Sequence, residues 1–99
     1  MSVALAYGEF CEKMGAIKIE EHIFHHAKRA TIDWFACTIP GGLETPAKLT
    51  FQALKEEIGS GASTILPAGQ KTTPRNAALI NGTASHTLEF DDIFRAGLY

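Results

Sequence analysis

Apolar residues recur at helical spacing along much of this chain, and prolines and glycines separate the periodic stretches. The clearest stretch covers residues 19–38. Its apolar residues are three or four positions apart and share one helical face: Ile19, Ile23, Ala27, Ala30, Trp34 and Cys37. From Ala30 onward nearly every position is apolar, so we expect the second half of this helix to be buried on several sides. Pro40 and the two glycines after it are expected to end the helix.

A helix is predicted on each side of this stretch. Residues 2–14 form the first, with Ser2 as N-cap and Gly15 as the stop, although its apolar period is poorly defined. Residues 45–58 form another, in which a threonine cap precedes a proline at the first helical position and a glycine follows the last turn. The apolar stripe of that helix comprises Ala47, Phe51, Leu54 and Ile58.

The last predicted helix runs from Thr73 and Pro74 to about Leu88, with a second, small-residue side that lets another helix approach closely. Its apolar side comprises Ala77, Ile80, Ala84 and Leu88. Asn81-Gly82 is also a hairpin-turn dipeptide. Helical spacing on both sides of it favours a continuous helix.

Residues 63–66 read as an extended segment, followed by a turn over residues 67–70. This segment is too short to be stable alone, and it pairs either with residues 71–72 or with something outside the chain. Four helices and one short extended segment predict an all-α, mainly helical fold in one domain.

Composition narrows the class of protein. With 45% hydrophobic and 20% charged residues, a chain of 99 residues fits one soluble domain and argues against overall disorder. A net charge of −2 and scattered basic residues argue against nucleic-acid binding, and no stretch reaches the roughly 20 apolar residues of a membrane span. The N-terminus lacks the basic start of a signal peptide, so we expect a cytoplasmic protein with Cys11 and Cys37 as free core thiols.

The densest chemistry lies at the end of the last predicted helix, where His86, Glu89, Asp91 and Asp92 fall within seven residues. The carboxylates stand at a helix C-terminus, whose partial charge is negative. Acids in that position hinder one another's ionisation, which suits proton transfer. A solvated acidic helix end and a divalent-metal site are the alternatives from the residues alone.

A second cluster, His22, His25 and His26, shares one helix face and is able to ligate a metal. The polar side of an amphipathic helix needs polar residues in any case. We therefore expect a surface cluster and no metal site.

Two stretches give the chain a family resemblance. Residues 26–35 read HAKRATIDWF, and residues 74–92 read PRNAALINGTASHTLEFDD. Together with the extended segment at residues 62–69, they resemble the N-terminal region of the MmgE/PrpD family, which includes 2-methylcitrate dehydratase, cis-aconitate decarboxylase and iminodisuccinate epimerase. The second stretch carries the resemblance most specifically, through its Asn-Gly pair, its histidine and its acidic ending.

The resemblance implies the N-terminal part of a larger helical domain and a cofactor-free proton abstraction from small di- or tricarboxylates. It implies His86, Glu89, Asp91 and Asp92 as catalytic residues and Asn81 as a substrate-binding residue. Full-length relatives are expected to be homodimers.

Two departures from the family pattern qualify these expectations. Dehydratases and decarboxylases commonly have Asp at the position of Glu89 and Thr at that of Ile93, so the chain looks closer to the epimerase-like branch. Relatives also continue well beyond the acidic loop, whereas apolar Phe94, Leu98 and Tyr99 have nothing here to bury them. We expect the 99 residues alone to be inactive; a small helical interaction module is the alternative function.

Overall fold

A computed structural model of the chain describes residues 2–90, and its architecture is mainly helical, as predicted. The described elements follow in this order: α1 (Val3–Ala16), α2 (Glu21–Gly41), α3 (Thr45–Ala53), the 3-10 turn η1 (Lys55–Glu57), β1 (Ser63–Thr64), β2 (Lys71–Thr72) and α4 (Pro74–Thr87). The two short strands pair antiparallel, with Ser63 opposite Thr72 and Thr64 opposite Lys71. The extended segment therefore pairs with residues 71–72 of the same chain.

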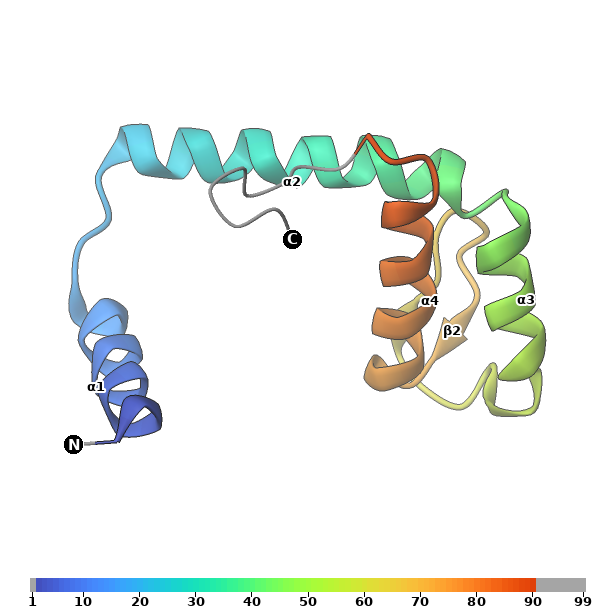
Figure 1. Cartoon of the computed structure of the whole chain (residues 1–99), viewed down its shortest axis with the longest axis horizontal. Helices are drawn as coiled ribbons and strands as arrows, with labels where there is room; N and C mark the ends of the chain where they lie inside the picture. Colours follow the sequence, from blue (N-terminus) through green and yellow to red (C-terminus); the bar gives the residue numbers. More distant parts are fainter. Residues whose placement is uncertain (1, 91–99) are drawn as a thin grey trace.

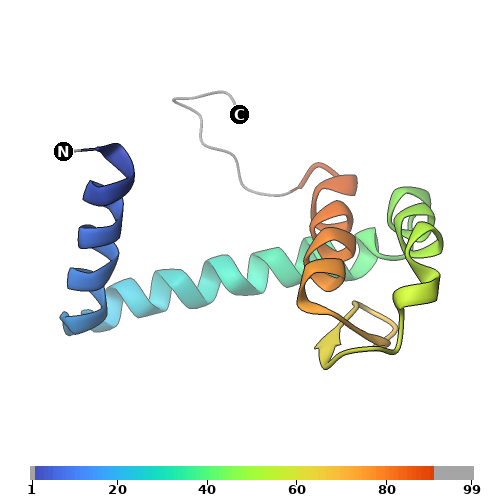
Figure 2. The same cartoon turned by 90° about the horizontal axis from the view of Figure 1, so that it is seen from below.

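The long helix α2 connects two regions that differ in packing. Figure 1 shows α1 beside one end of α2, and α3, the strands and α4 gathered at the other end. The view from below shows the same separation (Figure 2). The radius of gyration is 16.6 Å, whereas a compact domain of this length has about 13 Å. We call residues 37–87 the packed half and residues 3–36 the open half.

The packed half is built around α4, which packs against both α2 and α3. Its buried apolar side chains come from α2, α3, α4 and the segment after β1: Cys37, Ala47, Ile65, Ala77, Ile80 and Ala84. The predicted apolar sides of the third and fourth helices thus meet in one small core. Within residues 2–90, α1 contributes no residue to it.

Two adjacent glycines at the end of α2 allow three elements to meet. A Cβ atom on Gly41 would overlap the carbonyl oxygen of Ala84 in α4. A Cβ atom on Gly42 would lie 2.6 Å from the carbonyl oxygen of Leu66, in the segment after β1. Only glycine permits this approach of one backbone to another, so the end of α2 fixes the position of α4 and of the β1–β2 loop.

One prediction about α2 is confirmed and one is wrong. The helix ends within the Pro40-Gly41-Gly42 run, as predicted, with Gly41 as its last residue and Gly42 as its cap, whose N–H donates to the Thr38 carbonyl at 2.9 Å. The second half of α2 is not buried on several sides, contrary to the prediction, since Ile32 remains 68% exposed and Trp34 37% exposed. Within residues 2–90, α4 covers only the last turns of α2. The apolar residues that precede those turns therefore have no element to cover them.

The remaining helix boundaries differ in detail from the prediction. Ser2 caps α1 as expected, its Oγ accepting from Leu5 N–H at 3.2 Å, but the helix runs through Gly15 to Ala16. Gly15 does not have a positive φ, so it does not adopt the left-handed conformation of a helix stop.

The third helix starts and ends differently from the prediction. Thr45 is its first residue, with Glu44 in the cap position, and the helix ends at Ala53 before the separate turn η1. The fourth helix matches the prediction. Thr73 caps it, Pro74 is its first residue, and Asn81-Gly82 lies inside a continuous helix.

The two cysteines lie in different environments. Neither forms a disulfide, but only Cys37 is buried, so the expectation that Cys11 is a core thiol is wrong. Cys11 lies on α1, which nothing covers in the described part of the chain. Among residues 2–90, no helix is both long and apolar enough to cross a membrane.

Candidate functional site

The C-terminal turn of α4 carries two of the four predicted catalytic residues. The start of the helix is fixed by Thr73, whose Oγ1 accepts from Asn76 N–H at 3.4 Å. The middle is fixed by the burial of Ile80 and Ala84 against α2 and α3. A helix held over most of its length gives its last turn a defined position, and there His86 is exposed.

Glu89 adopts a backbone conformation that is rare for its residue type. It has φ of 55°, in the left-handed region, immediately after the C-cap residue Leu88. Its N–H donates to the carbonyl oxygen of His86 at 3.2 Å, which closes the turn at the helix end. Glycine is the usual residue in this position, and a side chain there costs about 1–2 kcal/mol. Strain of this kind is concentrated at functional sites.

Side chains beside His86 are turned back to the helix. Ser85 Oγ donates to the Gly82 carbonyl at 2.8 Å, and Thr87 Oγ1 donates to the Thr83 carbonyl at 2.7 Å. His86 and Glu89 are therefore the exposed ionisable residues of residues 85–90. Asp91 and Asp92 lie outside the described residues, so the predicted catalytic cluster as a whole stays a prediction, as does the apolar ending at residues 94–99.

Asn81 joins α4 to the segment after β1. Its Oδ1 accepts from Leu66 N–H and its Nδ2 donates to the Thr64 carbonyl oxygen, both at 2.9 Å. The side-chain amide thereby satisfies two backbone groups that the two-residue ladder leaves unpaired. Its substrate-binding role stays a prediction, and sequence reasoning missed this anchoring role because both partners lie at least 15 positions away.

A second polar cluster that sequence reasoning missed holds η1 against the start of α4. Glu57 Oε2 accepts from Asn76 Nδ2 at 3.0 Å and from Arg75 at 3.3 Å. The Glu57 carbonyl oxygen accepts from Ser60 Oγ at 2.6 Å and from Thr72 Oγ1 at 3.1 Å. Asn76 is only 1% exposed, so this cluster positions the helix rather than offering a site to a ligand.

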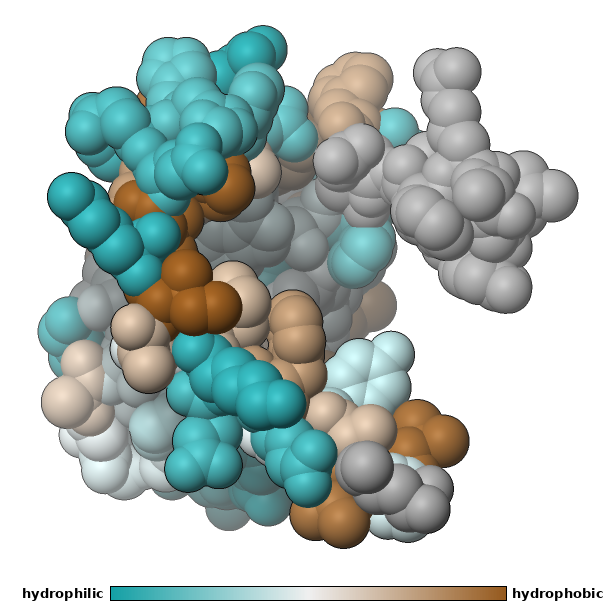
Figure 3. Space-filling model, turned by 90° about the vertical axis from the view of Figure 1, so that its left-hand side faces the viewer, coloured by the Kyte–Doolittle hydropathy of each residue, from teal (hydrophilic) through white to brown (hydrophobic). Residues whose placement is uncertain are grey.

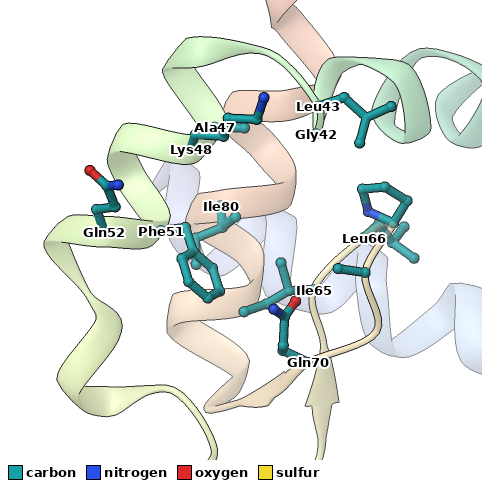
Figure 4. A pocket seen from close by; sticks show the side chains of 12 residues that line it. Gly42, Leu43, Ala47, Lys48, Phe51, Gln52, Ile65, Leu66, Gln70 and Ile80 are labelled. Carbon is teal, nitrogen blue, oxygen red and sulfur yellow. The ribbon is translucent and has the colours of Figure 1, made fainter.

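An apolar pocket of about 360 Å³ lies between α3, α4 and the β1–β2 loop (Figure 4). Phe51 points into it from α3, with Ile65 and Ile80 behind, and Lys48 and Gln70 lie at its edges. Of the predicted catalytic residues within residues 2–90, neither His86 nor Glu89 lines this pocket. It opens to the surface of the packed half, and its lining does not include His86 at the end of α4.

The histidine cluster on α2 lies on the surface, as predicted. His22 Nδ1 lies 3.3 Å from Glu20 Oε2, and both side chains are largely exposed. His25 and His26 make an edge-to-face ring contact with centroids 6.1 Å apart. Within residues 2–90, no group of three or more histidine, cysteine or acidic side chains is arranged to hold a metal ion.

The comparisons with known proteins identify a family. No curated protein and no solved structure matches the chain. The family model described as the MmgE/PrpD N-terminal domain matches residues 6–99, which is nearly the whole sequence. This match covers α2, the extended segment and α4, where the resemblance was recognised. The chain therefore belongs to the MmgE/PrpD family through its N-terminal domain.

Proposed function

We propose that this chain supplies part of the active site of a cofactor-free lyase or epimerase that removes a proton from small di- or tricarboxylates. The observation that carries the proposal is the family match over residues 6–99, which includes the whole of the acidic segment after α4. Within that segment, Glu89 is held in a strained backbone conformation next to the exposed His86. A carboxylate and an imidazole in one turn suit proton abstraction and return.

We assign the roles as follows. Glu89, Asp91 and Asp92 provide the carboxylates that take the substrate proton, and His86 returns it or stabilises the charge that develops. Asn81 contacts the substrate through the hydrogen-bonding positions of its side-chain amide that the two backbone partners do not occupy. Because Glu89 and Ile93 depart from the dehydratase and decarboxylase pattern, epimerisation is the preferred reaction.

A complete site needs walls from more than one element. In residues 2–90 the exposed turn of α4 has no facing element that encloses it, so we propose that the 99 residues alone do not turn over substrate. The active form is a homodimer of the full-length protein in the cytoplasm, a location that the absence of a disulfide between Cys11 and Cys37 favours.

The test uses the full-length gene product, including any coding sequence that continues in frame after Tyr99. It is incubated in D₂O with 2-methylcitrate, cis-aconitate and iminodisuccinate, and NMR follows deuterium uptake, elimination and loss of CO₂. We expect deuterium uptake at a carbon beside a carboxylate, reduced at least about 100-fold by Asp92→Asn.

Two outcomes would contradict the proposal. The first is a folded full-length protein that processes none of these substrates. The second is turnover by the 99 residues alone that Asp92→Asn abolishes, which would refute the claim that the site is incomplete. Thr87→Ser, a neighbouring change outside the assigned machinery, is the control and is expected to leave turnover within about twofold.

The alternative function, a small helical interaction module, is favoured by one observation. In the described part of the chain, α1 has no buried residue although it carries large apolar side chains. Such a surface indicates a contact with another protein surface. An interaction surface and a catalytic segment are compatible in one protein.

A further inference from the structure

The apolar pocket of the packed half differs from the exposed apolar surface of the open half. In the space-filling view from the α1 side, brown and tan apolar surface lies open among hydrophilic residues (Figure 3). The pocket, in contrast, is bounded by three elements, with Phe51 on α3, Ile80 on α4 and Ile65 in the β1–β2 loop (Figure 4). Ile65 and Ile80 are only 3% and 2% exposed, so the pocket reaches down to the core. A concave apolar surface of this kind suits a small molecule.

The size of the pocket limits what can occupy it. Its volume is about 360 Å³, whereas an apolar cavity of roughly 150 Å³ is enough to hold a benzene molecule. One aromatic ring with a short chain, or an alkyl chain of similar size, therefore fits. Ala47 and Ala68 contribute small side chains to the lining, and Phe51 offers an aromatic ring for contact with the ligand.

The walls of the pocket are held in place by contacts within this chain. Asn81 Oδ1 on α4 accepts from Leu66 N–H at 2.9 Å, and the backbone of Gly42 lies against the Leu66 carbonyl oxygen. Ile65 N–H donates to the Gln70 carbonyl oxygen at 2.9 Å, which closes the β1–β2 loop. The shape of the pocket therefore does not depend on an occupant, and sites for small molecules are usually formed in advance in this way.

The charge at the edge of the pocket selects the chemistry of the ligand. Three polar side chains belong to the lining, Lys48, Gln52 and Gln70, and Lys48 is the charged one among the described residues that form it. Within residues 2–90, no carboxylate lies within ion-pair distance of the Lys48 ammonium group. An apolar cavity with one cation at its edge is complementary to a molecule that has an apolar body and one negative charge at its end.

We propose that this pocket binds a small monocarboxylate with an apolar body, of the size of 3-phenylpropionate. The body lies against Phe51, Ile65 and Ile80, where it is removed from water. The carboxylate stays at the edge, where it pairs with the Lys48 ammonium group and accepts from the side-chain amide of Gln70.

Other occupants match the pocket less well. A di- or tricarboxylate, the substrate class of the proposed function, would place a second charge among apolar side chains that offer it no cation. A polypeptide segment laid over the pocket would cover the Lys48 ammonium group, which is costly unless the segment brings a carboxylate to the same place. The lining does not include His86 or Glu89, so the pocket is a second site, apart from the catalytic segment.

A ligand-observed NMR titration of the full-length gene product with 3-phenylpropionate tests the proposal. We expect saturable binding at one site per chain, with a dissociation constant below about 1 mM. Lys48→Met is expected to weaken it at least about tenfold. Lys55→Met, which removes the same charge from η1 outside the lining, is the matched control and is expected to change it less than about twofold. The uncharged 3-phenylpropionamide should bind at least about tenfold more weakly to the native protein and equally to both variants.

A second variant locates the apolar body of the ligand. Ala68 lines the pocket and is exposed, so Ala68→Trp is expected to fill the pocket without unfolding the protein and to weaken the acid and the amide at least about tenfold. Ala62→Trp, at an exposed position outside the lining, is its control, and circular dichroism checks that both variants are folded.

The titration follows binding and not turnover, so its outcome is independent of the proposed function. Three results would overturn the proposal: a folded full-length protein that does not bind the acid, which would mean that something else covers the pocket; equal losses in Lys48→Met and Lys55→Met; or displacement of the acid by cis-aconitate, which would place it at the catalytic segment.

Discussion

The two ends of α2 show what decides whether an apolar helix face becomes a core. At the C-terminal end, the backbone of Gly41 lies against Ala84 and that of Gly42 against Leu66, and Cys37 is buried beneath α4. Toward the N-terminal end, Ile23 and Phe24 are about as apolar, yet they remain 50% and 49% exposed. The burial of an apolar side chain on α2 therefore depends on which elements lie beside it, since Ile23 and Phe24 are strongly apolar and still exposed.

The packed half and the open half should therefore respond differently to substitution. The buried side chains of the packed half are surrounded by side chains of other elements, so removing or adding atoms there changes the free energy of global unfolding. Side chains in the open half touch little within residues 2–90, so changes there alter only local helix content or association. Four substitutions follow, from the largest expected effect to the smallest; two have a counterpart in the open half, and two compare changes within the packed half.

The largest effect is expected for Gly41→Ala. Its new Cβ atom would overlap the Ala84 carbonyl oxygen, which belongs to a rigid helix and has no rotamer by which to move. The free energy of unfolding is expected to fall by about 3 kcal/mol or more, measured by urea denaturation with circular dichroism. Gly8→Ala is the control in the open half and is expected to increase helix content, because alanine is the better helix former by about 1 kcal/mol. A neutral Gly41→Ala would mean that α2 and α4 do not cross as closely as the structure shows.

A second contrast comes from two adjacent residues of α4. Ile80 is 2% exposed in the core, whereas Leu79 is 54% exposed. Ile80→Ala is expected to lower the free energy of unfolding by about 2–4 kcal/mol, because a cavity forms beside the existing apolar pocket. Leu79→Ala is expected to lower it by less than about 0.5 kcal/mol. If thermal melting showed similar losses for both, Leu79 would have to be covered by a partner.

The success of the sequence predictions also differs between the packed half and the open half. The fourth helix was predicted in full because its signals are local: Thr73 as cap, Pro74 at the first position and apolar residues at helical spacing. Burial of the second half of α2 was wrongly predicted, because periodicity shows which face is apolar but not whether another element covers it. The strain at Glu89 had no sequence signal, since a left-handed glutamate is not distinguishable from any other acidic residue after a helix.

The anchoring role of Asn81 gives a third test, of intermediate size. Asn81→Ala leaves Leu66 N–H and the Thr64 carbonyl oxygen without their partner and is expected to cost about 1–3 kcal/mol. Hydrogen exchange measures the effect at one atom, because the Leu66 amide should lose its protection while the amide of Ile65, which donates to the Gln70 carbonyl, keeps more of its own. Asn81→Asp is expected to keep protection at Leu66 but to repel the Thr64 oxygen. Unchanged exchange at Leu66 in Asn81→Ala would show that the bond is not made in solution.

The smallest effect compares the same capping interaction in the two halves. Ser2 Oγ accepts from Leu5 N–H at 3.2 Å, and Thr73 Oγ1 accepts from Asn76 N–H at 3.4 Å. Replacing either cap by alanine removes about 1 kcal/mol of helix stability. Because α4 is central to the core, Thr73→Ala should transmit that loss to global unfolding and lower the urea midpoint. Ser2→Ala should leave the midpoint unchanged and reduce only the helical signal of α1, since α1 is able to unfold without disturbing the packed half. A midpoint that falls equally in both variants would show that α1 unfolds together with the packed half.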